Sequence, residues 1–196
     1  WPAYTLSNHD RVRAISRHDR GGTGDRRARL LAMMLLSLRG TPFIYYGEEI
    51  GMKEARLPRH RLKDAVGLKW YPFYRGRDGA RTPMQWNSLP GAVFTGGKPW
   101  LPVGPEAGSR DVCTQEGDPG SLLNFYRRLI RLRKQIPALT GGSFLPFTEM
   151  PKRCFVYRRA LADQSVLVAL NFSGSSQTLA VKKTDEYRQI LLSTIP

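Results

Sequence analysis

Cysteine and long apolar runs are scarce in this 196-residue sequence, and each shortage excludes a class of protein. The two cysteines, Cys113 and Cys154, lie far apart and form no Cys-x-x-Cys motif, so the sequence suggests neither a disulfide framework nor a zinc site. The longest apolar run, Leu30 to Leu38, is interrupted by Ser37 and is far shorter than the roughly 20 residues that cross a bilayer. We therefore expect no bound metal and no membrane-spanning segment.

Acidic residues are also few, with 16 Asp and Glu against 31 Lys and Arg, which gives a formal net charge of +15. A charge of this size raises the question of a nucleic-acid or membrane partner. The basic residues are spread along the whole chain, however, and no RNA-binding or zinc-finger motif accompanies them. We expect neither partner, and a salt-dependent gel shift would support the alternative of a basic nucleic-acid-binding module.

The chain opens on Trp1-Pro2 without an initiator Met or a signal peptide, so we expect a cytoplasmic protein whose true N-terminus precedes this sequence.

The N-terminal part of the chain is predicted to form a strand, a helix and a second strand. Residues 3–7 are apolar and β-prone, and Thr41–Tyr46 form a similar run. Between them we expect a basic loop over Arg11–Gly24 and then a helix with Asp25 in its first turn. The helix is apolar nearly all round over Leu30 to Leu38, which is typical of a buried helix. This order predicts a βαβ unit in a parallel sheet.

The middle of the chain, about 48–119, is rich in Gly, Pro, Trp and Arg and predicts a long ordered loop. Residues 121–135 return to a helical period, with apolar residues on one face and Arg and Lys on the other. Arg133 falls within the apolar arc and needs a partner. Pro137 is expected to end the helix, and Gly141-Gly142 to mark a domain boundary.

The sequence after residue 141 changes to short β-type runs with turn-like connections, which predict a small antiparallel sheet domain. The runs are Phe144–Phe147, Cys154–Arg158, Val166–Phe172, Thr178–Val181 and Ile190–Leu192.

Three polar clusters could carry chemistry, and the first is Asn8-His9-Asp10 at the end of the first strand. In a parallel α/β sheet the carboxyl ends of the strands form the ligand face. His9 could donate a hydrogen bond to a neutral ligand, and Asp10 could accept from hydroxyls or face developing positive charge, kept ionised by nearby arginines. A structural His-Asp loop is the alternative interpretation.

The other two clusters lie further along the chain. Residues 40–49 end in Glu48 and Glu49 after the second strand, and their alternative interpretation is a shaped turn with one Glu paired to an Arg. Residues 76–86 alternate Arg, Asp and Arg before a Trp, a pattern that resembles a sugar-binding surface. The arginine side chains could hydrogen-bond to sugar hydroxyls, and the Trp ring could pack against the apolar face of the sugar ring. A loop held by Arg–Asp pairs is the alternative there.

These clusters occur in the order SNHDRVR, GTPFIYYGEEIGM and GRDGARTPMQW, and they resemble the motifs of the retaining α-glucosidases of the α-amylase superfamily, in the oligo-1,6-glucosidase branch. The resemblance covers nearly the whole chain and implies an α/β plus β fold. Residues 1–140 would be strands seven and eight of a (β/α)8 TIM barrel, and residues 141–196 an antiparallel β-sandwich domain, incomplete at its end. It also implies hydrolysis of terminal α-glucosidic bonds in short oligosaccharides without a cofactor, with an oligosaccharide or α-glucoside and the rest of the barrel as partners.

The resemblance also assigns roles to single residues. Asp10 matches the third catalytic carboxylate, which stabilises the transition state and holds the 2- and 3-hydroxyls of the glucosyl ring. His9 is implied to contact the same hydroxyls, Arg81 to bind the 4-hydroxyl of the terminal glucose, and Arg13 to lie near the same pocket.

A nucleophile and an acid/base, which retaining glycosidases place about 5 to 5.5 Å apart, are missing from these motifs. In this family they come from the fourth and fifth barrel strands, which precede everything present here. Glu48 and Glu49 cannot replace them, because neighbours on a strand point to opposite faces. We therefore expect the isolated chain to be inactive.

Two alternatives remain open. A non-catalytic amylase-like scaffold of the transporter heavy-subunit type would have no need of His9 and Asp10. A trehalose-6-phosphate hydrolase, a sucrose isomerase or another transglucosylase shares these motifs, and the sequence does not separate them.

Overall fold

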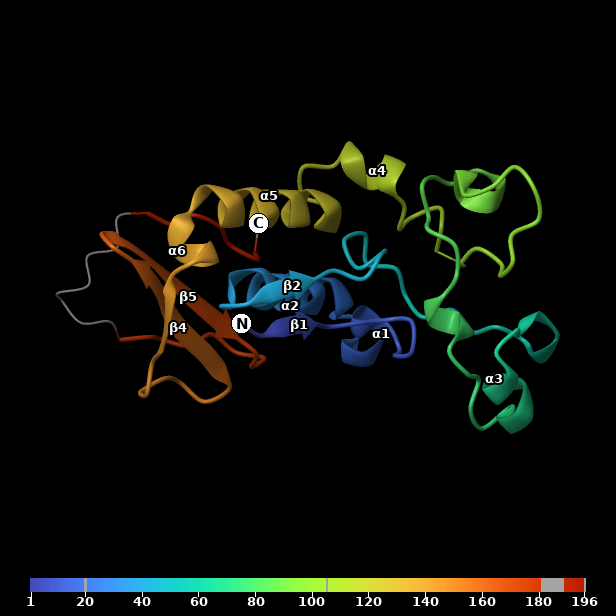
Figure 1. Ribbon diagram of the computed structural model, residues 1–196, viewed down its shortest axis with the longest axis horizontal. Coiled ribbons are helices and arrows are strands. Elements are labelled where there is room, and N and C mark those ends of the chain that lie inside the picture. The colour runs from blue at the N-terminus through green and yellow to red at the C-terminus, as the bar shows by residue number, and fades with distance from the viewer. Residues whose placement is uncertain (20, 105, 181–188, 196) are drawn as a thin grey trace. The chain divides into compact units, whose positions relative to one another are not determined.

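The computed structural model describes residues 1–19, 21–104, 106–180 and 189–195 (Figure 1). The chain forms two compact units. Unit 1 consists of Trp1–Tyr4, Leu30–Pro42 and Arg128–Pro196, and unit 2 of Thr5–Arg29 and Phe43–Arg127. Within the described residues, no helix is both long and apolar enough to cross a membrane.

The predicted order of strand, helix and strand is observed as β1 (Ala3–Thr5), α2 (Gly24–Ser37) and β2 (Thr41–Phe43). The two strands are neighbours in one sheet, and the Thr41 N–H donates to the Pro2 carbonyl at 2.8 Å. Asp25 lies in the first turn of α2, as predicted. Both strands are shorter than predicted. After β2 the chain turns, and the Glu48 N–H donates to the Tyr45 carbonyl.

The predicted loop over Arg11–Gly24 is wrong in its middle part, where α1 (Ala14–His18) forms. The Ala14 N–H donates to the Ser7 hydroxyl, and Ala14 and Ile15 are buried. A five-residue helix is too short to show a hydrophobic period, so the sequence pattern did not reveal it, and its stability comes from burial and from the hydrogen bond to Ser7.

The middle of the chain is ordered, as predicted, but it is not a plain loop. It contains α3 (Ala65–Trp70), α4 (Val112–Glu116) and the 3-10 turns η1 (Arg59–Arg61), η2 (Asp78–Ala80) and η3 (Pro90–Val93). Asp64 and Asp111 cap α3 and α4, because their carboxylates accept the Val66 and Thr114 N–H groups. Small apolar clusters hold this region together: Ile50, Met52, Met84 and Leu123 form one, and Ala55, Leu57, Leu62 and Leu101 another.

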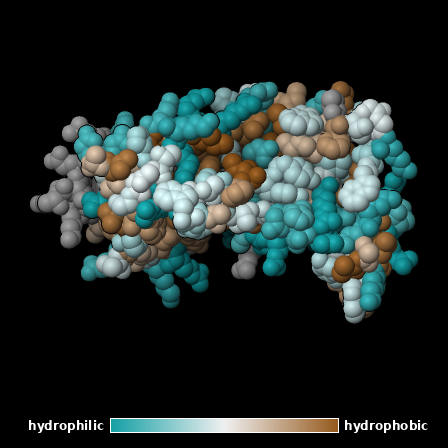
Figure 2. All heavy atoms as spheres, viewed as in Figure 1, coloured by the Kyte–Doolittle hydropathy of each residue, from teal (hydrophilic) through white to brown (hydrophobic). Residues whose placement is uncertain are grey.

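The predicted amphipathic helix is confirmed as α5 (Leu122–Gln135). Its basic residues are exposed except Arg133, which is partly buried, and Figure 2 shows hydrophilic residues along the side of the molecule where α5 runs. Pro137 follows the end of α5, as predicted, and also begins the short helix α6 (Pro137–Thr140). The buried residues of α5 are Leu122, Leu123, Phe125, Tyr126 and Leu129.

Unit 1 holds the predicted antiparallel sheet, formed by β3 (Ser143–Pro146), β4 (Cys154–Leu161) and β5 (Gln164–Asn171) in that order (Figure 1). Tyr157, Val168 and Leu170 are buried and pack with apolar residues of α2. The two further predicted strands are wrong where the structure describes them: residues 178–180 and 190–192 are not in strands, and Val181 lies outside the described residues.

Two arginines in unit 1, the partly buried Arg133 and the buried Arg159, bind main-chain carbonyls. Arg133, whose need for a partner was predicted, donates to the carbonyls of Leu36, Leu38 and Gly40 at 2.7 to 3.1 Å. Arg159 is fully buried and donates to four carbonyls. The acceptors of Arg159 are Ser37, Leu139, Gly142 and Ser143. Together the two guanidinium groups bind the Leu36 and Ser37 carbonyls at the C-terminal end of α2, where a positive charge is also favoured.

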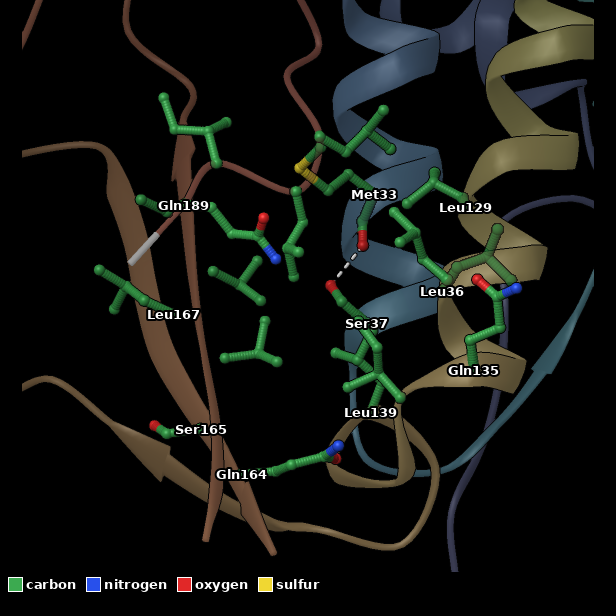
Figure 3. Close-up of a pocket in the computed structure, with 18 of the residues that line it drawn as sticks. Met33, Leu36, Ser37, Leu129, Gln135, Leu139, Gln164, Ser165, Leu167 and Gln189 are labelled. Atoms are coloured by element: carbon green, nitrogen blue, oxygen red, sulfur yellow. Dashed lines mark hydrogen bonds between the residues drawn. The ribbon is translucent and has the colours of Figure 1, made fainter. Parts of the chain in front are cut away.

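A cavity of about 1060 Å³ also lies in unit 1 (Figure 3). Its lining includes Met33 of α2, Leu129 of α5, Leu139 of α6 and Leu167 of β5. Asp163 is the one carboxylate among its described lining residues. A mostly aliphatic lining offers little acid–base chemistry, and the three polar sequence clusters lie mostly in unit 2.

Candidate functional site

The predicted Asn8-His9-Asp10 cluster forms a turn directly after β1. The Asp10 N–H donates to the Asn8 side-chain oxygen at 2.9 Å, which fixes the turn. The side chains of His9 and Asp10 remain 68% and 48% exposed, and His9 Nε2 lies 3.4 Å from Asp10 Oδ2. The turn therefore presents an imidazole and a carboxylate side by side to solvent.

Two arginines from the third cluster converge on Asp10. Arg77 Nη1 lies 3.2 Å and Arg81 Nη2 lies 3.0 Å from the same oxygen, Asp10 Oδ1. Arg81 Nε also donates to the His9 carbonyl at 2.9 Å. The structure thus brings together His9, Asp10 and Arg81 from the predicted set and adds Arg77. The sequence signal for Arg77 was the alternation of Arg, Asp and Arg in its cluster.

The electrostatics of Asp10 favour its charged form. Desolvation alone would raise the pKa of Asp10, but the interaction with His9 and the hydrogen bonds from Arg81 and Arg77 outweigh it and lower the pKa below the usual value of the carboxyl group. At neutral pH the side chain is therefore a carboxylate. It can accept hydrogen bonds from hydroxyls and stabilise a positive charge placed beside it.

Arg77 is held on its other side by Asp64, whose side chain is 1% exposed. Arg77 Nε and Nη2 donate to the two Asp64 oxygens at 3.0 and 2.9 Å. The hydrogen bonds from Arg77 are the main reason that the pKa of Asp64 falls to about 2, and the same bond raises the pKa of the Arg77 guanidinium.

Arg13 faces the interior of unit 2. Its Nη1 donates to the Tyr46 carbonyl at 2.7 Å and its Nη2 to the Ala80 carbonyl at 2.9 Å. The guanidinium also lies against the rings of Tyr45 and Tyr46, with Cζ 5.2 and 4.8 Å from their centroids. Arg13 therefore ties all three sequence clusters together. Its predicted place near the substrate stays a prediction.

Glu48 and Glu49, the carboxylates of the second cluster, are largely shielded from solvent. Desolvation raises the pKa of both carboxyl groups. Glu48 accepts the Tyr45 N–H at 3.3 Å and so helps to close the turn after β2. Within the part of the chain that the structure describes, no group of three or more His, Cys, Asp and Glu is placed to hold a metal ion.

Comparisons with known proteins identify relatives of this chain. The sequence model of the family described as "Alpha amylase, catalytic domain" matches residues 1–142. A probable alpha-glucosidase of Rhizobium meliloti (strain 1021) is 42% identical over 91% of this chain and 32% of the relative. An oligo-1,6-glucosidase of Parageobacillus thermoglucosidasius is 37% identical over 88% of this chain and 34% of the relative.

Among solved structures, the alpha-glucosyl transfer enzyme XgtA is 40% identical, with a TM-score of 0.87 over 97% of this chain and 35% of that one. The chain thus spans about a third of the length of these relatives. These matches confirm the resemblance inferred from the three motifs.

Proposed function

Because this chain belongs to the alpha-amylase family, we propose that it forms the C-terminal third of a retaining α-glucosidase that releases terminal glucose from short α-linked oligosaccharides. Residues 1–140 supply strands seven and eight of the barrel, and residues 141–196 supply part of a β-sandwich domain. The observation that carries the proposal is the convergence of Arg77 and Arg81 on the Asp10 carboxylate directly after β1. The similarity to a probable alpha-glucosidase and to an oligo-1,6-glucosidase supports the proposal.

The proposed mechanism divides the chemistry between this chain and the rest of the enzyme. Retaining hydrolysis forms a covalent glucosyl intermediate on a nucleophilic carboxylate and then hydrolyses it with water, aided by an acid/base residue. We assign both groups to the part outside this chain. Asp10 accepts hydrogen bonds from the 2- and 3-hydroxyls of the glucosyl ring, and its charge stabilises the positive charge that develops at the anomeric carbon. His9 donates to the same hydroxyls, and Arg81 donates to the 4-hydroxyl.

The experiment that tests this proposal is hydrolysis of p-nitrophenyl α-glucoside by the longer protein that contains this chain. We expect turnover, with α-glucose as the first anomer seen by proton NMR. The isolated 196-residue chain is expected to give no turnover, because it lacks a nucleophile and an acid/base in the site motifs. A longer protein that is inactive on α-glucosides would contradict the proposal and favour the non-catalytic scaffold.

A second candidate is glucosyl transfer to a sugar or alcohol acceptor, which the 40% identity to the alpha-glucosyl transfer enzyme favours. Transfer uses the same covalent intermediate but replaces water by an acceptor hydroxyl. Product analysis at high acceptor concentration separates the two reactions: glucosylated acceptor in excess over free glucose indicates transfer.

A further inference from the structure

We propose that Asp64 is a positioning residue, which acts by fixing the guanidinium of Arg77 on the carboxylate of Asp10. The inference rests on the proposed function of Asp10. Its physical basis lies in how the five donors of an arginine are divided between two carboxylates.

The Arg77 guanidinium is gripped at two points by Asp64. Nε donates to Oδ2 at 3.0 Å and Nη2 donates to Oδ1 at 2.9 Å, which fixes the plane of the fork. The remaining nitrogen, Nη1, then lies 3.2 Å from Asp10 Oδ1. One orientation of the fork therefore serves both carboxylates, and a rotation that improved one contact would weaken the other.

Asp64 is itself immobilised, which makes it a suitable anchor. Its side chain is buried and also accepts the N–H groups of Val66 and Arg77. Its own N–H donates to Oδ2 of the buried Asp78 at 2.8 Å. Gly76 contributes space, because a Cβ there would come within 2.6 Å of Asp64 Oδ2. With so many contacts, the Asp64 carboxylate has little freedom to follow a displaced arginine.

Asp64 also closes the segment between residues 64 and 77, so a purely structural role has to be distinguished from positioning. A structural role predicts a loss of stability that is independent of Arg77. Positioning predicts that the effect of Asp64 on Asp10 disappears once Arg77 is removed.

The test is a double-mutant cycle with Asp64→Asn and Arg77→Ala in the longer protein. Asp64→Asn is expected to lower kcat/KM on the order of 100-fold, because a loosened arginine no longer orients Asp10. In the Arg77→Ala background the same change should alter kcat/KM by no more than about twofold. Asp111→Asn is the matched control, since Asp111 is buried and caps α4 in the same way but pairs with Thr114 instead of an arginine; its kcat/KM should stay near wild type.

A readout independent of turnover is the titration of the Asp10 carboxyl carbon by NMR. Asp64→Asn should raise the pKa of Asp10, because the Arg77 charge that lowers it is no longer held in place. Arg77→Ala should raise it as well, and the double variant no further. Additive effects on both kcat/KM and this pKa, or an unchanged pKa in Asp64→Asn, would overturn the inference. A wild-type protein without glucosidase activity would contradict the proposed function instead. The NMR titration of Asp10 would then still show whether Asp64 acts on Asp10 through Arg77.

Discussion

The two units of this protein use arginine in different ways. Unit 1 contains twelve Lys and Arg against four Asp and Glu, and unit 2 contains nineteen against twelve. In unit 1 the guanidinium groups of Arg133 and Arg159 donate to main-chain carbonyls around the end of α2. In unit 2, Arg77 and Arg81 pair with a half-exposed carboxylate, Asp10.

The difference shows how one residue type can be structural in one place and functional in another. Carbonyl acceptors are fixed by the fold and face inward, so an arginine bound to them stabilises the fold and presents nothing to a ligand. Desolvation lowers the pKa of both Arg133 and Arg159, yet a guanidinium remains charged at any physiological pH. A carboxylate held by arginines at the surface remains charged and accessible to a ligand. Part of the positive net charge therefore has a structural explanation.

The largest effect on stability is expected from Arg159→Met, which removes the donor of four buried carbonyl contacts. We expect the free energy of unfolding, measured by urea denaturation of the longer protein, to fall by about 3 kcal/mol or more. The matched control is Arg127→Met, because Arg127 pairs with Glu116 at the exposed surface; it should change the free energy by less than about 1 kcal/mol. Equal urea midpoints for Arg159→Met and Arg127→Met would contradict the claim that Arg159 stabilises the fold of unit 1.

The opposite pattern is expected from Arg81→Met in unit 2. Here kcat/KM on an α-glucoside should fall about 100-fold, because the variant loses a donor to Asp10 and, in the proposed mechanism, a donor to the sugar. The free energy of unfolding should change by less than about 1 kcal/mol, since the partner is half exposed. A variant that unfolds easily but keeps its turnover would show that Arg81 belongs with the structural arginines.

The smallest expected effect concerns the pH dependence of stability. The pKa of Asp64 is about 2 in the folded protein against a usual 3.8, so its carboxylate contributes stability above pH 3.8 that is lost as pH falls towards 2. Asp64→Asn should remove this contribution. The free energy of unfolding of the wild type should therefore exceed that of the variant at pH 4, and this difference should shrink as the pH falls towards 2. A difference that stays constant between pH 4 and 2 would contradict the assigned Asp64–Arg77 bond.

The sequence predicted those features that depend on local pattern. The period of α5, the polar turn after β1 and the need of Arg133 for a partner were all visible in short windows. The contacts of Asp64 with Arg77 and of Arg159 with carbonyls were not, because they join residues through the fold with no pattern that marks the pairing. The helix α1 was missed for a related reason, since its stability comes from burial and from a hydrogen bond to Ser7, seven residues away.

The predicted β-type runs show the same limit. Three of them form the antiparallel sheet, where each strand has a hydrogen-bonded neighbour. The runs near residues 178 and 190 have comparable composition but no strand forms in their described residues. Composition thus marks segments that can pair, and whether they do depends on a partner strand elsewhere in the chain.

The most direct test of the central claim is kcat/KM of Asp10→Asn in the longer protein, on an α-glucoside. The substitution keeps the size of the side chain but removes the charge that the transition state needs. We predict a loss on the order of 100- to 1,000-fold. The control Asp118→Asn changes another aspartate that accepts a backbone N–H, from Gly120, and should leave kcat/KM unchanged. An Asp10→Asn enzyme within about twofold of wild type would contradict the claim that the carboxylate held by Arg77 and Arg81 is part of the catalytic site.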